Sequence, residues 1–393
     1  MKKWLFFAVA LGLLVWVVWP HMRSFDQMGK RRFDALSRPA KEVVVGVCWP
    51  FSVNQDGMAD GLQLALEEIN TRNLAGGYTI RLVMRDDAFD KQKEKRIAME
   101  FANTPDMSAV IGYYDDAPAV RASTIFESSR LLHLIIGGNN TAMTSHGFQY
   151  IVRTTLASDK IAQSLARMTV NRGHHRVAVL WEEDAYGEDL AYQYGAYLDN
   201  TNTQIVYQWS YSRERPDFRL PVNELKGIDA DVIFFAGLEP WAGDFLRSAR
   251  GVGLTIPIVG AFSDTPEMRK RAGQALEGAM YFDIYDMLSP SPENQAFVKA
   301  FRARYGTNPD AWAAQGYDAL HILAKAVKFT KSRNPLDLSY AIRYMDAWEG
   351  ANGRYKFDGT GELADKPIFL EMFKSGKPVL IQEGGGDASK PVS

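Results

Sequence analysis

The chain has 393 residues, enough for two ordinary domains, and 46% of them are hydrophobic, so a substantial core can be buried. Its formal net charge of −2, with no basic helix or stripe, argues against a nucleic-acid partner. The single cysteine, Cys48, excludes a disulfide framework and a thiolate metal site. Because Cys48 stands in an apolar run, we interpret it as a small buried hydrophobic residue.

The N-terminal segment differs in kind from the rest of the chain. Two lysines precede an uncharged apolar run from Trp4 to Trp19, whose length lies between those of a signal-peptide core and a transmembrane helix. No small-x-small cleavage site or lipid-attachment cysteine follows it. We therefore expect residues 1–24 to form an uncleaved signal anchor, with a cleaved signal peptide as the alternative. Residues 25–41 are polar and basic and are expected to form a linker.

From residue 42 onward, strand and helix patterns alternate. The apolar runs predict strands at 43–48, 79–84, 108–111, 132–136, 176–181, 205–209, 232–236 and 258–260. Helical periodicity predicts helices at 58–70, 91–103, 118–129, 159–171, 188–198, 218–225, 241–252, 292–305, 311–329 and 337–346. A terminal hairpin is expected from residues 353–358, 367–373 and 379–382. This alternation predicts an α/β fold with parallel sheets and right-handed crossovers, and its restart after about residue 155 predicts two similar lobes.

Several short motifs share the order and spacing of one family. They are GLQLALEEIN from Gly61 to Asn70, Asp86-Asp87, Val110 to Gly112, Gly147 to Tyr150 with Arg153 to Thr155, Asp184 to Gly187, Leu246 to Gly253 and Tyr355 to Glu362. In this respect the chain from Val43 to Gln382 resembles the type I periplasmic binding proteins, specifically the leucine/isoleucine/valine-binding receptors of ABC importers.

The resemblance implies two Rossmann-like lobes with parallel central sheets, joined by a three-crossover hinge. Mapped onto this chain, lobe 1 would comprise 42–154 and 286–345, and lobe 2 would comprise 155–285 and 346–383. The remaining residues, 384–393, would form a flexible tail.

The resemblance also implies a function without chemistry, because closure of two hinged lobes around a small ligand is itself the signal to a partner. We expect an extracytoplasmic solute-binding protein that presents an amino acid or related small molecule to an ABC permease. The alternative is a membrane-anchored module that reports ligand occupancy to a signalling partner. In either case, we expect the protein at the periplasmic or extracellular face of the cytoplasmic membrane, anchored by the N-terminal helix. The alternative is a soluble periplasmic protein after the signal is cleaved.

The turn after the third strand is the first candidate wall of the ligand cleft. In amino-acid-binding members of the family this turn is rich in serine and holds the ligand carboxylate, whereas here it reads Tyr113, Tyr114, Asp115 and Asp116. Two carboxylates facing a ligand carboxylate would repel it, at about 1–4 kcal/mol for each close pair. We therefore hypothesise a cationic or aromatic-stacked neutral ligand, with aromatic walls from Tyr113, Tyr114, Tyr186, Trp241 and Phe262. The alternative is that Asp115 and Asp116 only cap the following helix.

Other candidate ligand residues come from the resemblance. Gly138, Asn139 and Thr141 stand where the family has a second wall, although they also fit an ordinary polar turn. Tyr186 corresponds to a cleft-lining aromatic residue. Phe262, with Asp264 nearby, stands where the family has a glutamate that pairs with the ligand ammonium.

Catalytic and metal-binding readings find little support in the sequence. No nucleophile motif, phosphate loop or His-Glu-x-x-His pattern occurs, so we expect neither an enzyme nor a cofactor or metal. The cluster from Glu182 to Asp184 is interpreted as the rim of the cleft rather than as a catalytic pair.

Overall fold

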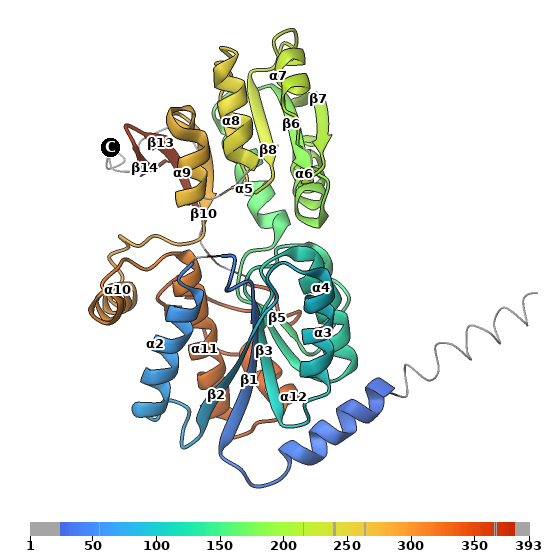
Figure 1. Cartoon of the computed structure of the whole chain (residues 1–393), viewed down its shortest axis with the longest axis vertical. Helices are drawn as coiled ribbons and strands as arrows, with labels where there is room; N and C mark the ends of the chain where they lie inside the picture. Colours follow the sequence, from blue (N-terminus) through green and yellow to red (C-terminus); the bar gives the residue numbers. More distant parts are fainter. Residues whose placement is uncertain are drawn as a thin grey trace, which may run out of the picture.

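In the computed structural model, the chain forms two α/β lobes stacked along its long axis (Figure 1). The structure describes residues 24–54, 56–214, 216–238, 241–262, 265–364, 366 and 368–381. The predicted fold class, two lobes with parallel central sheets, is confirmed by the strand order of both sheets.

Lobe 1 is built on a five-stranded sheet in the order β2-β1-β3-β4-β5, in which all neighbours are parallel. Its strands are β1 (Glu42–Trp49), β2 (Thr79–Asp86), β3 (Met107–Gly112), β4 (Leu132–Ile135) and β5 (Ile151–Arg153). In the central strand β1, Glu42 is exposed and every later residue is buried. A continuous apolar run of this kind is typical of a strand covered on both faces.

Lobe 2 is built on a seven-stranded sheet in the order β14-β13-β10-β9-β8-β6-β7. Its strands are β6 (Arg176–Glu182), β7 (Gln204–Tyr211), β8 (Val232–Ala236), β9 (Ile258–Gly260), β10 (Met280–Asp283), β13 (Phe369–Lys374) and β14 (Lys377–Leu380). Strands β6 to β10 are parallel, and β13 and β14 add an antiparallel edge.

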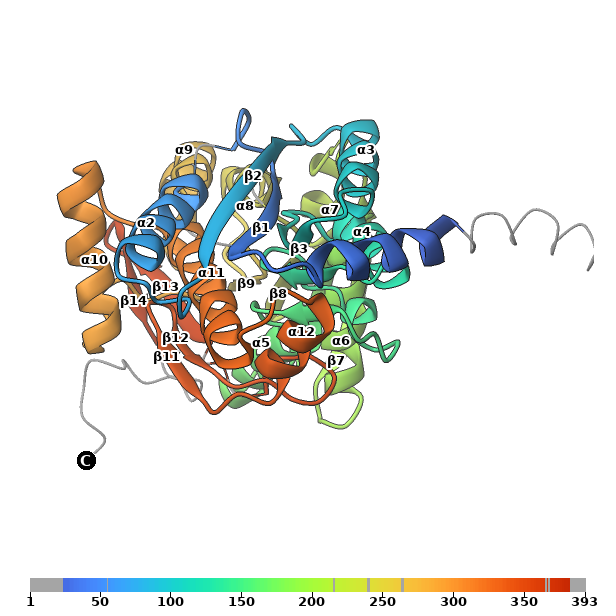
Figure 2. The ribbon, with the colours of Figure 1, turned by 90° about the horizontal axis from the view of Figure 1, so that it is seen from below.

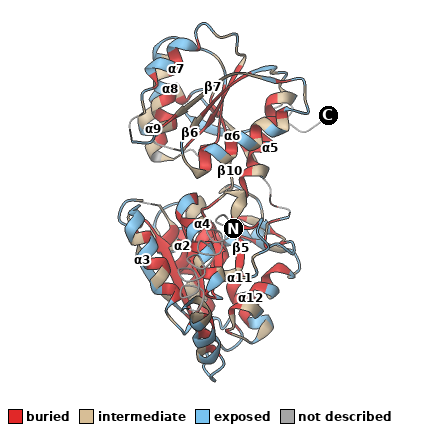
Figure 3. Cartoon of the chain, turned by 90° about the vertical axis from the view of Figure 1, so that its right-hand side faces the viewer, coloured by how far each residue is buried: buried red, intermediate tan, exposed pale blue. Residues whose placement is uncertain are grey.

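Helices cover both faces of each sheet, as the buried interior in Figure 3 shows. On lobe 1 they are α2 (Met58–Thr71), α3 (Lys91–Ala102), α4 (Asp116–Ser128), α10 (Pro292–Tyr305), α11 (Ala311–Thr330) and α12 (Pro335–Arg343). On lobe 2 they are α5 (Ser158–Asn171), α6 (Ala185–Leu198), α7 (Arg219–Glu224), α8 (Trp241–Gly251) and α9 (Pro266–Ala272). Helices α2, α11 and α12 pack on one face of the first sheet and α3 and α4 on the other.

The chain passes between the lobes three times: after β5, after β10 and before β13 (Figure 1). The segment before the last crossing belongs to lobe 1, because Tyr355, Phe357 and Leu363 are buried in the same core as α2 and α11. We had expected lobe 2 to resume at residue 346. The packing instead places this crossing between Leu363 and β13.

The predicted terminal hairpin is only partly present. Phe357 forms an antiparallel bridge with Leu363 around the expected turn. However, β12 (Gly353–Tyr355) pairs with β11 (Trp348–Gly350), while β13 pairs with β10 and β14 in the other sheet. The pairing prediction was wrong because apolar alternation identifies a strand but not its partner.

The segment expected to be a linker is helical over residues 24–36 and lies against lobe 1 (Figure 2). Arg32 of this helix is 1% exposed. Its guanidinium donates to the backbone carbonyls of Phe101, Ala102, Thr104, Met107 and Ser129. Arg32 therefore joins the helix to the ends of α3 and α4, which the polar composition of 25–41 did not reveal.

The predicted membrane anchor falls almost entirely on residues 1–23, which lie outside the described residues. Among the helices that the structure describes, none has the length and apolar character needed to cross a membrane.

Candidate functional site

The turns that follow the strands of the two sheets meet between the lobes, and we call this region the interlobe site. Gly112 ends β3 with φ at +139°, and a Cβ there would lie 2.3 Å from the carbonyl oxygen of Cys48. Only glycine fits so close to a neighbouring strand in this conformation. The chain can therefore leave β3 beside the end of β1, where Tyr114 contacts Trp49 and Asp115 reaches Arg213 of lobe 2.

Four aromatic side chains at the carboxyl ends of the lobe 1 strands form an aromatic platform: Trp49, Phe89, Tyr114 and Trp312. The Tyr114 ring centroid lies 5.1 Å from those of Trp49 and Trp312 and 5.5 Å from that of Phe89. Trp49 is fully buried beneath the others, whereas Phe89 is 38% exposed. Edge and tilted ring contacts of this kind hold the rings in fixed positions.

An acidic cluster lies next to Tyr114 and spans both lobes. Arg213, in the loop after β7, pairs with Glu182 and with Asp184 of lobe 2, the latter at 3.0 Å, and reaches Asp115 of lobe 1 at 3.5 Å. Burial raises the pKa of Asp115, and Arg213 opposes that rise. Burial likewise raises the pKa of Glu182, with the charge of Asp184 adding to it. Three carboxyl groups thus share one guanidinium.

The second wall makes direct bonds between the lobes. The backbone N–H of Thr141 donates to Asp189 at 3.0 Å, and the Asn140 amide donates to the carbonyl oxygen of Ala185 at 2.9 Å. Ala185 is the first residue of α6, whose N-cap is Asp184, and Asp189 lies one turn further along the same helix. In this arrangement of the lobes, Thr141 binds lobe 2.

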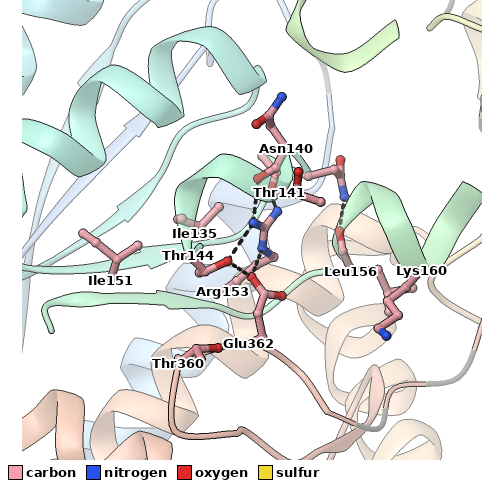
Figure 4. A network of polar contacts seen from close by, with 12 residues as sticks. Ile135, Asn140, Thr141, Thr144, Ile151, Arg153, Leu156, Lys160, Thr360 and Glu362 are labelled. Atoms are coloured by element: carbon pink, nitrogen blue, oxygen red, sulfur yellow. Dashed lines mark hydrogen bonds and ion pairs between the residues drawn. The ribbon is translucent and has the colours of Figure 1, made fainter. Parts of the chain in front are cut away.

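A buried arginine fixes the shape of that wall. Arg153, fully buried, donates to the carbonyl oxygens of Gly138 at 3.0 Å and Asn140 at 2.7 Å, and its Nε donates to Glu362 at 2.8 Å. Figure 4 shows its guanidinium enclosed by Asn140, Thr144 and Glu362. Because these partners come from separate segments, one side chain positions the whole turn.

Asp116 is the N-terminal residue of α4 and is 5% exposed. One of its oxygens accepts the N–H of Asn139, while Oδ2 has no hydrogen-bond partner among the described residues. Burial raises the pKa of Asp116 to about 7. Asp115 occupies the N-cap position of α4 without a side-chain capping bond, so the capping interpretation accounts for neither carboxyl in full.

Three of the predicted ligand aromatics turn inward. Tyr113 is fully buried in the core beneath the sheet, where its hydroxyl reaches the Glu94 carbonyl oxygen. The Tyr186 hydroxyl donates to the carbonyl oxygen of Ala261 at 2.8 Å. Phe262 is 1% exposed and packs near Tyr281. The fourth, Trp241, is partly buried against the lobe 2 core, and Asp264 lies outside the described residues.

The sequence reading missed five residues of the interlobe site. They are Trp49, Phe89, Glu182, Arg213 and Trp312. Glu182 had been interpreted as rim, yet it is 1% exposed. The available signal was positional: Trp49, Phe89 and Glu182 each end or closely follow a strand, where ligands of open α/β sheets bind.

A pocket of about 660 Å³ lies elsewhere, at the amino ends of β9 and β10. Arg172, His174, Arg250 and Glu277 are among its lining residues. Since open α/β sheets bind ligands outside the carboxyl ends of their strands, we do not assign the principal ligand to this pocket. Among the residues that the structure describes, no group of three or more His, Cys, Asp or Glu side chains could hold a metal ion.

Comparison with known proteins decides the family. The model of the family described as "Periplasmic binding protein" matches residues 45–377. The chain belongs to that family. The resemblance to the leucine/isoleucine/valine-binding group is also confirmed: the Leu/Ile/Val-binding protein homolog 2 of Brucella abortus is 25% identical over 383 residues, covering 96% of this chain and 98% of the relative. The leucine-specific-binding protein of Salmonella typhimurium is 26% identical over 355 residues, covering 84% and 95%.

Solved structures agree with this assignment. An ABC transporter substrate-binding protein from Desulfitobacterium hafniense, in complex with Leu, has a TM-score of 0.78 at 29% identity and covers 86% of this chain and 100% of its own. A leucine-binding protein from Thermotoga maritima has a TM-score of 0.79 at 21% identity, covering 86% and 98%, and supports the fold. The family's type I fold therefore accounts for both lobes of this periplasmic binding protein.

Proposed function

We propose that this protein is an extracytoplasmic solute-binding protein that captures a small molecule, an amino acid or a related compound, between its lobes and delivers it to an ABC importer. The observation that supports this most directly is that relatives named as binding proteins match this chain over nearly all of its length and of their own. The Desulfitobacterium relative is by name an ABC transporter substrate-binding protein, which favours transport over the sensing role that the sequence left open.

The interlobe contacts support a binding cycle based on lobe movement. The bonds from Asn140 and Thr141 to α6, and the pair between Asp115 and Arg213, are few and lie at polar, partly exposed groups. Such contacts can break and re-form at little cost, as a hinged two-lobe receptor requires. A ligand held by both lobes would favour the arrangement in which these contacts form.

A ligand screen tests the proposed function. The purified protein is heated with a set of amino acids, amines and small carboxylates, and the midpoint of unfolding is recorded. We expect one chemical class to raise the midpoint, because a ligand that binds only the folded state stabilises it. The same compounds should lower the radius of gyration in X-ray scattering. If stabilising compounds bind without compaction, lobe closure is not the binding event.

Membership of the family supports a periplasmic location, and attachment to the membrane is a further part of the proposal. Residues 4–19 are apolar, and the helix over 24–36 is joined to lobe 1 through Arg32. An uncleaved N-terminal segment would therefore hold lobe 1 close to the outer face of the cytoplasmic membrane. N-terminal sequencing of the mature protein checks this, because a start at residue 25 or later would show that the segment is removed.

A further inference from the structure

The charge at the interlobe site points to a particular class of ligand, an inference that rests on the proposed function. Asp115, Glu182 and Asp184 are all held by the one guanidinium of Arg213. If all three were ionised, the cluster would carry two uncompensated negative charges. Arg213 is 44% exposed while Glu182 is 1% exposed, so the arginine approaches this buried carboxyl from the solvent side.

A further carboxyl group, Glu94, adjoins this region, and two arginines near it are already paired. Burial raises the pKa of Glu94, and the charges of Asp87 and Asp115 raise it further. Arg121 pairs with Glu94 at 2.9 Å. Arg153 is enclosed by backbone carbonyls and Glu362. To bind a ligand carboxylate, Arg121 would have to give up its contact with Glu94, and Arg153 its contacts with Glu362 and backbone carbonyls.

Asp116 adds a second, independent sign that the site is incomplete. Its Oδ2 is buried and has no hydrogen-bond partner among the described groups, although it lies beside Asp115 in the same turn. A buried carboxyl oxygen without a partner is costly. Only a donor that reaches Oδ2 itself would remove that cost.

The aromatic platform supplies the complementary surface. Tyr114 directly precedes Asp115 in the chain. Tyr114 and Trp312 are partly exposed and contact each other, and both are backed by the buried ring of Trp49. Aromatic faces attract cations and also pack well against apolar groups. The platform and the acidic cluster together match a molecule with one apolar part and one positively charged part.

We propose that the interlobe site binds a small organic cation, an amine with an apolar body and no carboxylate, with its charge toward Asp115 and Asp184 and its body on Tyr114 and Trp312. A free carboxylate on the ligand would face Asp115 and Glu182 rather than hydroxyl groups. The ligand class therefore differs from the leucine that the Desulfitobacterium relative holds.

Two sets of three matched compounds test the ligand class by calorimetry on the purified protein. One set is 3-methylbutylamine, leucine and 4-methylpentanoate, and the other is 2-phenylethylamine, phenylalanine and 3-phenylpropanoate. Within each set the apolar body is the same, and only the charged groups differ. We expect the amine to bind at least about tenfold more tightly than the amino acid, and the carboxylate not to bind measurably.

Variants locate the binding site. Asp115→Asn and Tyr114→Ala should each weaken amine binding about tenfold, and Tyr114→Phe should retain most of it. Asp217→Asn is the matched control, because Asp217 is an exposed lobe 2 carboxylate paired with Arg219. Circular dichroism confirms that each variant is folded. Amine binding that is unchanged in Asp115→Asn and Tyr114→Ala would overturn the proposal.

The outcomes separate the ligand class from the function. If leucine or phenylalanine binds more tightly than its amine and Tyr114→Ala weakens that binding, the cationic class is wrong while the solute-binding function stands. If neither set binds, but mass spectrometry finds a small molecule released from the denatured protein, the function stands. The class is then supported by a released amine without a carboxylate and overturned by any other molecule. If neither set binds and no molecule is released, both proposals fail.

Discussion

The most buried arginines of lobe 1 and the interlobe arginine of lobe 2 act in opposite ways. In lobe 1, Arg32, Arg153 and Arg343 are almost fully buried and donate mainly to backbone carbonyls that come from separate segments. In lobe 2, Arg213 is 44% exposed and binds carboxylates at the interlobe site. The first kind of contact fixes the backbone, whereas the second can be exchanged for another cation. Lobe 1 is therefore a rigid frame, and lobe 2 brings to it an electrostatic surface that a ligand can compete for.

The same contrast extends to the interlobe site. Lobe 1 contributes the aromatic platform, whose rings hold one another in place. Lobe 2 contributes Glu182 and Asp184, which depend on Arg213 for their charge balance. A ligand would thus meet a preformed apolar surface from lobe 1 and a rearrangeable charged surface from lobe 2.

The largest expected effect comes from removing a frame arginine. Arg153→Ala should lower the free energy of unfolding by about 3–5 kcal/mol, because it leaves Glu362 and two carbonyls without their buried donor. Urea denaturation followed by circular dichroism measures the change. Arg219→Ala is the control, since its side chain is 86% exposed and its loss should change the free energy of unfolding very little. Equal effects of the two variants would remove the distinction between the lobes.

The pH dependence of the unfolding free energy tests the role of Asp116 in the rigid frame of lobe 1. Its pKa, about 7, is raised above the usual value of an unfolded aspartate, so the folded state holds the proton more tightly. The stability contributed by this proton is present at low pH and is lost as pH rises toward 7. Asp116→Asn should flatten the dependence of unfolding free energy on pH from about 4 to 8, by up to about 4 kcal/mol.

The control for that experiment is another aspartate with the opposite shift. Hydrogen bonds from Arg219 lower the pKa of Asp217 to about 2, so its contribution to stability is lost only as pH falls below about 4. Asp217→Asn should therefore leave the slope between pH 4 and 8 unchanged. A slope that is the same in Asp116→Asn and in the unmodified protein would show that another group titrates in this range.

Arg32→Ala should have a smaller effect, about 2 kcal/mol, because its partners are carbonyls at the ends of helices and some of them can be hydrated once it is lost. Hydrogen exchange should quicken over residues 24–36 and much less in the sheet. Exchange that quickens throughout lobe 1 would mean that Arg32 supports the whole frame rather than the docking of one helix.

Local patterns in the sequence predicted most of the frame. The buried run of β1 and the periodicity of α2 identify their elements because each depends on nearby residues alone. Pairing between distant segments was beyond such reasoning. The partner of β12 and the docking of Arg32 depend on which surfaces remain unfilled after the core has formed, and a single sequence does not record that.

In the interlobe site, too, the sequence indicated the residues that depend on local pattern and not those brought in by distant segments. Asp115 and Tyr114 follow a strand directly, so their position was readable. Of two successive tyrosines, Tyr113 is fully buried and Tyr114 joins the aromatic platform, and a one-residue change in register would exchange them. Trp312 reaches the platform because α11 packs against α2, and Arg213 reaches Asp115 only when both lobes are assembled.

A substitution at Asp189 should have the smallest effect on stability. It also tests most clearly whether the contacts between the lobes can break and re-form. Asp189→Ala removes the acceptor for Thr141, so it should change the unfolding free energy by less than about 1 kcal/mol. It should nevertheless increase the radius of gyration of the ligand-free protein in X-ray scattering, because one of the bonds between the lobes is lost. Glu188→Ala, on the exposed side of the same helical turn, should change neither quantity. A large loss of stability in Asp189→Ala with an unchanged radius would place this contact in the frame instead, and the hinge would then have to open elsewhere.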